Sequence, residues 1–214
     1  PGSHPGLFPV RGGTRMAKKN ARNTRASIVD AAWQLFYEQG YEDTTVEEII
    51  AASHTSKGSF YHYFGGKDAL LSTLSDLFDQ KYQDLQPTLD PAMPALDKLL
   101  FLNRALFQMI EDRVPLDLLA RLLSTQLVTT GARHLLDHRR TYYRLLRQII
   151  AQGQETGQLT RDQSVSDMVK IYALCERALL YDWCLCGGEY SLAAYAKEQM
   201  PRFLAQLLPG NSSG

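Results

Sequence analysis

Apolar residues recur at three- and four-residue intervals in every long segment of this chain, and signals for β-strands are almost absent. This interval is the period of an amphipathic helix, so the pattern predicts an all-α fold. Gly and Pro interrupt the pattern repeatedly, and cutting the sequence at these loop signals leaves about nine helices. The first three are short and end near residue 64, whereas the later ones are long.

The composition excludes several classes of protein. Lys and Arg total 23, Asp and Glu total 23, and 44% of the 214 residues are hydrophobic, which rules out a disordered, highly charged tail protein. The formal net charge of +0 argues against a non-specific architectural DNA protein, because such binding depends on a large positive charge. No run reaches the roughly 18 apolar residues that cross a bilayer. The odd number of cysteines, three, argues against a disulfide scaffold and favours a reducing, cytoplasmic compartment.

The first residues of the chain look like an expression leader rather than part of the fold. They are rich in Pro and Gly and show no apolar period, and Met16 looks like the natural start. The helical pattern then changes from short to long segments near residue 66. We therefore expect a leader over residues 1–15, a first domain over 16–66 and a larger helical domain over 67–210.

The first helix is expected to carry one apolar stripe and to end at a glycine. The stripe consists of Ile28, Ala31, Ala32, Leu35 and Phe36. Asn23 or Thr24 can cap the start of this helix. Gly40 can take the left-handed conformation that closes it, with Tyr41 folding back.

Two short helices joined by a tight turn are expected to follow. Thr45 and Glu48 have the spacing of a capping box at the start of the first one. A turn at Ser53 and His54 separates it from the second, which covers residues 55–64. Two such helices braced by a preceding helix form the helix-turn-helix plan of many DNA-binding domains.

Many positions between residues 25 and 70 fit one pattern at fixed spacing. They are Arg25, Ile28, Ala31, Ala32, Leu35, Phe36, Gly40, Tyr41, Thr44, Thr45, Val46, Ile49, Ser56, Lys57, Gly58, Ser59, Phe60, Tyr61, Tyr63, Phe64, Lys67 and Leu70. This pattern resembles the TetR family of bacterial transcriptional regulators. Beyond residue 70 the resemblance extends only to the number and lengths of the helices.

The chain departs from the family pattern at two points. His54 stands where the turn usually has Gly, and Gly66 stands where a polar cap usually precedes the next helix. His54 can still form the turn, because His tolerates positive φ better than most side chains. Gly66 can still cap the next helix, although it offers no side-chain acceptor.

The second short helix is expected to lie in the major groove of DNA and to read bases with its N-terminal residues. Its hydrogen-bond donors are Thr55, Ser56, Lys57 and Ser59. Lys57 suits the O6 and N7 atoms of guanine best. Gly58 removes a side chain where the helix backbone must approach the duplex closely.

Further DNA contacts follow from the resemblance. It implies that Tyr61, His62 and Tyr63 touch phosphates or thymine methyl groups. It also implies that Thr45 and Lys67 hold the DNA backbone at helix starts, where phosphates are favoured. Three of these residues also have a purely structural interpretation: Tyr61 and Tyr63 could be core aromatics, and Lys67 could be solvated.

The surface of this first domain is expected to divide by charge. Residues 30–48 carry acidic but no basic side chains, so we expect them to face away from the duplex. The basic residues Lys18, Lys19, Arg22 and Arg25 should face toward it. Phe60 and Phe64 are expected to pack inward.

The later helices are expected over residues 67–85, 94–112, 115–129, 131–155, 163–186 and 190–208. The last two are apolar over more than one stripe, so a partner subunit is expected to cover a face that the bundle leaves open. Two helices from each chain would then form a four-helix bundle and a homodimer, as the TetR resemblance also implies. The residues expected at this interface are Leu179, Trp183, Tyr195, Phe203 and Leu207.

The TetR resemblance further implies that the bundle encloses a pocket for a small effector. The candidate pocket residues are Phe78, Tyr82, Phe101, Phe107, Tyr142 and Tyr143. Aromatic residues at helical spacing also fit an ordinary core, so both interpretations stay open for each of them. The composition favours an apolar or aromatic ligand.

No other chemistry is predicted. The chain has no nucleophile–base pair, zinc signature or phosphate loop, so we expect no catalytic residue, metal or cofactor. Cys184 and Cys186 could suggest a metal or redox site, but residues two apart on a helix face different directions, which favours buried cysteines. The basic residues expected on one helix are Arg133, His134, His138, Arg139, Arg140, Arg144 and Arg147. They could bind an anion, although a solvated or salt-bridged face also explains them.

These observations predict a DNA-binding transcriptional regulator. We expect a homodimeric repressor that a small molecule releases from a nearly palindromic operator. The alternative is a helical small-molecule-binding protein or enzyme with an incidental helix-turn-helix.

Overall fold

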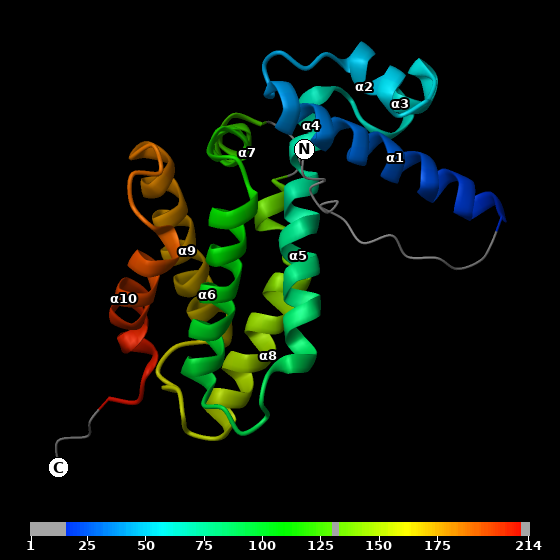
Figure 1. The fold of residues 1–214 in the computed structure, drawn as a ribbon. Coiled ribbons are helices and arrows are strands. Elements are labelled where there is room, and N and C mark those ends of the chain that lie inside the picture. Colours follow the sequence, from blue (N-terminus) through cyan, green and yellow to red (C-terminus); the bar gives the residue numbers. More distant parts are fainter. Residues whose placement is uncertain (1–15, 130–132, 211–214) are drawn as a thin grey trace. The chain divides into compact units, whose positions relative to one another are not determined.

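The structure, a computed structural model, describes residues 16–129 and 133–210, with side chains from residue 23 onward (Figure 1). All regular secondary structure in these ranges is helical, so the predicted all-α fold is confirmed. No helix within them has the length and apolar character needed to span a membrane. The predicted leader over residues 1–15 lies outside the described residues.

The chain divides into two compact units between Leu77 and Phe78. The first contains α1 (Met16–Gln39), α2 (Val46–Ala52), α3 (Lys57–Tyr63), α4 (Lys67–Leu71) and the start of α5 (Thr73–Leu85). The rest of α5 and the later helices belong to the second. This division follows the packing of the chain, whereas the predicted boundary after residue 66 marks the start of a helix and stays a prediction.

Helix α1 braces the first unit and packs against α2 and α3. Its buried residues are Ile28, Val29, Ala31, Ala32, Trp33 and Phe36. Gly40 ends the helix at φ +88° and donates its N–H to the Phe36 carbonyl over 3.1 Å, as predicted. The predicted cap at Asn23 or Thr24 is wrong, because α1 begins at Met16 and both residues lie within it.

The turn between α2 and α3 contains a strained residue at a position where the sequence departs from the family pattern. The capping box at the start of α2 is present: Thr45 Oγ1 accepts from the Glu48 N–H, and the Glu48 carboxylate accepts from the Thr45 N–H. His54 then adopts φ +52°, the left-handed region that favours glycine. A 2.8 Å hydrogen bond between the Ser53 and Thr55 hydroxyls closes the turn around it.

A break at Ser72 separates α4 from α5, so the predicted single helix over 67–85 is wrong. Hydroxyl side chains explain the break, because they bond carbonyls three residues back and compete with the helical pattern. Ser72 donates to the Ala69 carbonyl and Thr73 to the Leu70 carbonyl, each over 2.6 Å. The indole N–H of Trp33 donates to Thr73 Oγ1 over 2.8 Å and fixes the start of α5 against α1.

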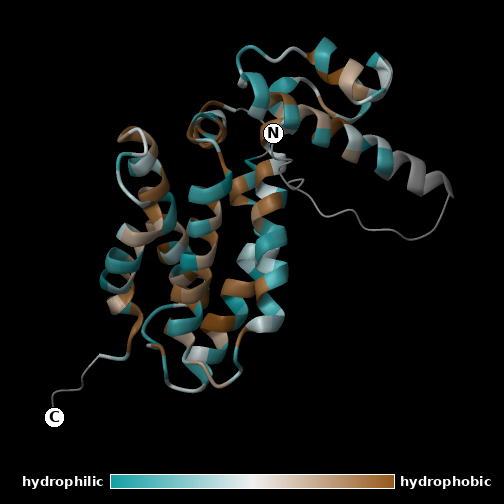
Figure 2. Cartoon of the chain, viewed as in Figure 1, coloured by the Kyte–Doolittle hydropathy of each residue, from teal (hydrophilic) through white to brown (hydrophobic). Residues whose placement is uncertain are grey.

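The second unit is a helical bundle. It consists of α6 (Ala95–Arg113), α7 (Leu116–Val128), α8 (Thr141–Glu155), α9 (Val165–Leu185) and α10 (Leu192–Leu204), with short 3₁₀ turns at Gln86–Thr88, His134–Leu136 and Ala205–Leu207. Helix α6 packs against α8 and α10, and α9 packs against α7, α8 and α10. Figure 2 shows hydrophobic residues gathered where these helices face one another and hydrophilic residues on their outer sides.

The predicted helix over 131–155 begins ten residues late, at Thr141. Residues 133–140 form a 3₁₀ turn and loop, in which the Asp137 carboxylate accepts from both the backbone N–H and the guanidinium of Arg139. These bonds lower the pKa of Asp137 to about 2. The basic residues predicted to share one helix face are therefore divided between a loop and α8, and that prediction is wrong.

Replacing His54 with Gly should stabilise the protein, because glycine adopts a φ of +52° without the steric cost that a side chain incurs. We expect a gain of about 0.5–1 kcal/mol in the free energy of unfolding. His62→Gly is the matched control, since glycine inside α3 should cost about 1 kcal/mol instead. Urea denaturation measures both variants, and equal losses in the two would contradict the assignment of strain to His54.

Candidate functional site

Helix α3 presents its first residues to solvent. Ser56 caps the helix, and its hydroxyl accepts from the Ser59 N–H over 3.1 Å. Of the predicted DNA contacts, Thr45, Ser56, Lys57, Gly58, Tyr61 and His62 are exposed, and Thr55, Ser59, Tyr63 and Lys67 are half-buried. The ten residues therefore all retain some surface, and those at the start of α3 form a polar, exposed end of a helix.

The opposite face of α3 is buried, as predicted. Phe60 is 0% exposed and Phe64 is 4% exposed, with their ring centroids 6.0 Å apart. The guanidinium of Arg25 lies 5.5 Å from the centre of the Phe64 ring. Tyr61, one residue after Phe60, turns outward and is 48% exposed. Burial of the two phenylalanines thus fixes the rotation of α3 and exposes its polar side.

Lys57 projects from the first turn of α3 with its side chain 71% exposed. Its Nζ lies 3.9 Å from Glu47 Oε1 and 6.0 Å from the centre of the Tyr61 ring. Glu47 therefore lies beside the first turn of α3, whereas the acidic residues between 30 and 48 were expected to face away from the duplex. An exposed pair of this kind is weak, so the carboxylate screens Lys57 without fixing it in place.

Lys67 is occupied by backbone carbonyls. Its Nζ donates to the carbonyl of Tyr41 over 2.6 Å, that of Glu42 over 3.2 Å and that of Thr44 over 2.8 Å. The same ammonium lies 4.3 Å from the centre of the Tyr41 ring. A lysine has three N–H donors, and here each has a carbonyl to bond. Lys67 therefore holds the loop that leads into α2, and a phosphate contact requires some of these bonds to break.

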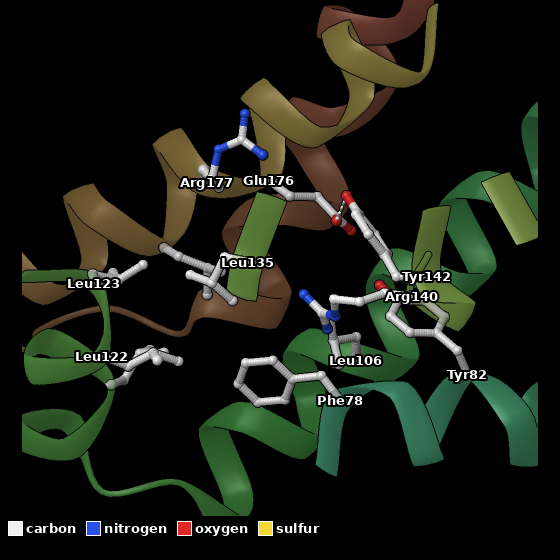
Figure 3. A pocket seen from close by; sticks show the side chains of 12 residues that line it. Phe78, Tyr82, Leu106, Leu122, Leu123, Leu135, Arg140, Tyr142, Glu176 and Arg177 are labelled. Carbon is white, nitrogen blue, oxygen red and sulfur yellow. Dashed lines mark hydrogen bonds between the residues drawn. The ribbon is translucent and has the colours of Figure 1, made fainter. Parts of the chain in front are cut away.

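The bundle contains a small, mostly apolar cavity of about 50 Å³ (Figure 3). It is lined by Phe78, Tyr82, Leu106, Leu119, Leu122, Leu123, Leu135, Arg140, Tyr142, Glu176, Arg177 and Leu180. Three predicted pocket residues, Phe78, Tyr82 and Tyr142, are among them. Phe101, Phe107 and Tyr143 are not, and the last of these donates its hydroxyl to the Leu135 carbonyl over 3.0 Å.

The charged residues of this cavity were not predicted from the sequence. Glu176 is 4% exposed, and it accepts from Asn103 Nδ2 over 2.9 Å and from the Tyr142 hydroxyl over 2.7 Å. Burial raises the pKa of the Glu176 carboxyl. Arg140 donates from Nε and Nη2 to the two oxygens of Asp79, over 3.1 Å each. A lone acid in an apolar helical stretch was the available signal for Glu176.

The candidate interface residues fall into two groups. Leu179, Trp183 and Leu207 are buried within the chain, whereas Tyr195 and Phe203 of α10 are 42% and 39% exposed. The exposed apolar residues of α9 are instead Leu174, Ala178, Tyr181 and Leu185. Their spacing of three and four residues places them along one side of the helix.

The cysteines belong to no metal-binding group: within the described residues, no three or more His, Cys, Asp or Glu side chains are placed so that they could hold a metal ion. Burial was predicted for Cys184 and Cys186. Cys184 is only half-buried, and burial raises its pKa to about 11. Cys186 is exposed, because it follows the end of α9, so the prediction is wrong for this residue.

The sequence relatives of this chain are bacterial regulators. Residues 28–74 match the sequence model of a family described as bacterial regulatory proteins, tetR family. The repressor DhaR from Mycobacterium sp. (strain GP1) is 27% identical over 148 residues, which cover 64% of this chain and 71% of that protein. The regulator AcrR from Shigella flexneri is 31% identical over 100 residues, which cover 47% of this chain and 46% of that protein. The aligned part of the chain thus spans about half the length of AcrR.

Solved regulator structures share the fold. FadR from Thermus thermophilus, a TetR family repressor in complex with lauroyl-CoA, has a TM-score of 0.69 at 23% identity and covers 89% of this chain and 98% of its own. FadR from Bacillus subtilis, in complex with stearoyl-CoA, has a TM-score of 0.67 at 18% sequence identity. The alignment covers 86% of this chain and 99% of the FadR chain. At these identities the likeness shows the fold alone. The named relatives and structures are transcriptional regulators rather than enzymes.

Lys67→Met should separate a structural from a DNA-contacting role of this lysine. Loss of a charged donor to backbone carbonyls should lower the free energy of unfolding by about 1–3 kcal/mol. The salt dependence of DNA binding should stay unchanged, because the ammonium neutralises no phosphate when it holds the loop. Fluorescence anisotropy across a salt series measures this. A slope of log K against log salt that is shallower by about 0.9 would show a lost phosphate contact instead.

Proposed function

We propose that this chain, which belongs to the TetR family of bacterial regulatory proteins, is a homodimeric repressor that a small effector releases from a nearly palindromic DNA operator. One observation carries the DNA-binding part of the proposal. Helix α3 buries Phe60 completely and leaves the polar residues of its first turn exposed, which is the arrangement of a helix that reads the major groove.

The residues of α3 have distinct roles in this proposal. Lys57 reads guanine through O6 and N7, since it is the long, exposed donor of the first turn. Gly58 leaves room for close approach, because a Cβ there would meet only Ser56 Oγ, at 3.9 Å. Tyr61 and His62 are exposed at the far end of the helix and contact the phosphate backbone. Glu47 lowers the affinity for any duplex, because its carboxylate lies beside Lys57.

The exposed apolar stripe of α9 supports the dimer. Leu174, Tyr181 and Leu185 are 50%, 49% and 69% exposed, and Tyr195 of the adjoining α10 is 42% exposed. Such a surface is stabilised by burial against its own copy across a two-fold axis. This revises the interface predicted from the sequence: the exposed side of α9 replaces Leu179, Trp183 and Leu207, which are buried within the chain.

Effector binding acts on DNA affinity through α5 in this proposal. Phe78 and Tyr82 of this helix line the cavity, and Thr73 at its start is tied to α1 by the Trp33 indole. A ligand that enlarges the cavity displaces α5, and the displacement continues along the helix to its first turn. A coupling free energy of about 1–3 kcal/mol between effector binding and operator binding would change operator affinity about 5- to 150-fold. The protein acts in the cytoplasm in this proposal, because a repressor must reach its operator on the chromosome.

Lys57→Ala tests the reading role of α3. The ratio of operator affinity to random-DNA affinity should fall about 5- to 150-fold, because a base contact carries about 1–3 kcal/mol of discrimination. Glu47→Gln is the matched variant: it should raise affinity for both DNAs a few-fold and leave their ratio nearly unchanged. Anisotropy titrations against both duplexes measure this, and an unchanged ratio in Lys57→Ala would remove the base-reading role.

Leu185→Asp tests the dimer surface. A charge on the proposed interface should convert the dimer to monomer and abolish high-affinity operator binding, because the two half-sites are no longer held together. Leu127→Asp is the matched control, since Leu127 of α7 is 68% exposed and lies outside the stripe. Sedimentation equilibrium gives the mass of each variant. Dimers of equal strength in both variants would exclude this face of α9.

A further inference from the structure

The cavity in the bundle has mostly apolar walls, to which Arg140, Tyr142 and Glu176 add polar groups. Leucines of α6, α7 and α9 and the ring of Phe78 make the apolar walls. Figure 3 shows Glu176 and Tyr142, joined by their hydrogen bond, on the side away from Phe78 and Leu122. A ligand in this space must therefore have an apolar body and polar atoms at one end.

Glu176 is a buried acidic group that forms no ion pair with a cation among the described residues. Its carboxylate accepts from the neutral groups of Asn103 and Tyr142, and no ion pair joins it to a Lys, Arg or His among the described residues. Arg177 acts on it only at longer range and is half-buried. Burial raises the pKa of this carboxyl because no cation lies beside it, and a ligand cation at this point would stabilise the ionised form.

Tyr82 supplies a second, independent signal. Its side chain is 1% exposed, it lines the cavity, and its hydroxyl has no hydrogen-bond partner among the described residues. An unpaired buried hydroxyl costs free energy that a bound polar group would recover. The hydroxyl of Tyr142, which donates to Glu176, keeps its own acceptor lone pairs.

The aromatic rings favour the same ligand charge. Tyr82 and Tyr142, which both line the cavity, lie with ring centroids 5.2 Å apart. Ring faces attract cations, most strongly where water is excluded. The cation already at the cavity, Arg140, is neutralised by its two bonds to Asp79, so it does not supply the missing countercharge to Glu176.

We infer that the cavity binds a compact apolar amine, whose ammonium donates to the Glu176 carboxylate and to the hydroxyl oxygens of Tyr82 and Tyr142. This inference deepens the proposed function and rests on it only where it makes the amine an effector. The cavity is smaller than the roughly 150 Å³ of cavities that hold benzene, so its wall, to which α5 contributes Phe78 and Tyr82, must move when the ligand enters. That movement is the displacement that the proposed release mechanism requires.

The test uses the full-length protein and three probes of one shape: benzylamine, benzyl alcohol and benzoate. Isothermal titration without DNA should show benzylamine bound at least about tenfold more tightly than the other two, because the charged hydrogen bond is lost in both. Equal binding of the three, tighter binding of benzoate, or no binding of any would overturn the inference. Binding of lauroyl-CoA in preference to benzylamine would overturn it as well.

Two variants assign the binding to the cavity. Tyr82→Phe removes the unpaired hydroxyl, so the melting temperature should stay level or rise while benzylamine affinity falls several-fold. A merely structural tyrosine would lower the melting temperature and leave the affinity unchanged. Glu176→Gln should lower benzylamine affinity about tenfold or more and reduce its advantage over benzyl alcohol, whereas Glu155→Gln, on the exposed side of α8, should change neither.

The two proposals fail separately in this design. Operator binding is measured on the same protein by anisotropy, with and without benzylamine. Selective benzylamine binding without operator release would uphold the cavity chemistry and contradict the effector mechanism. Operator binding together with the loss of amine selectivity would uphold the DNA-binding function and contradict the cavity chemistry.

Discussion

Burial of Phe60 is the interaction on which the DNA-binding unit depends. Its ring is completely buried in a unit where α3 packs against α1 and α2, and this fixes both the position and the rotation of a helix only seven residues long. A helix this short has little stability of its own, so tertiary packing must hold it in place. Because the aromatic face of α3 packs into the core, the opposite, polar face of the helix is exposed to solvent.

Local hydrogen bonds also hold α2 and the loop before it in place. The capping box of Thr45 and Glu48 starts α2, and the hydrogen bond from the Thr45 N–H lowers the pKa of the Glu48 carboxyl, so this carboxylate stays ionised to a lower pH. Lys67 then binds the loop before α2 through three carbonyls. These contacts connect the start of α4 to the start of α2, so the two helix starts move together.

Sequence patterns predicted the parts of the fold that local chemistry decides. The left-handed residues Gly40 and His54, the capping box and the inward turn of Phe60 all follow from rules that act over a few residues. The break at Ser72 did not, because serine and threonine hydroxyls inside a helix bond their own backbone only in some contexts. The start of α8 was missed for a similar reason, since Asp137 and Arg139 form a local turn within a stretch of helical composition.

The sites were harder to predict because they depend on contacts between distant residues. Lys57 and the exposure of α3 follow from the motif, but the carboxylate of Glu47 beside Lys57 requires the packing of α2 on α3. Glu176 meets Asn103 across 73 residues and Tyr142 across 34, distances in sequence that helical periodicity does not resolve. Periodicity also could not say which apolar side of α9 is buried within the chain and which is exposed.

The most direct test of the central claim is a hydroxyl-radical footprint on a duplex that the protein selects from random DNA. Paired α3 helices predict two inverted half-sites, each protected where a major groove faces the protein, with centres about 10–10.5 base pairs apart or a multiple of that spacing. Selection of no common sequence, or protection of one half-site alone, would contradict a two-fold pair of reading helices.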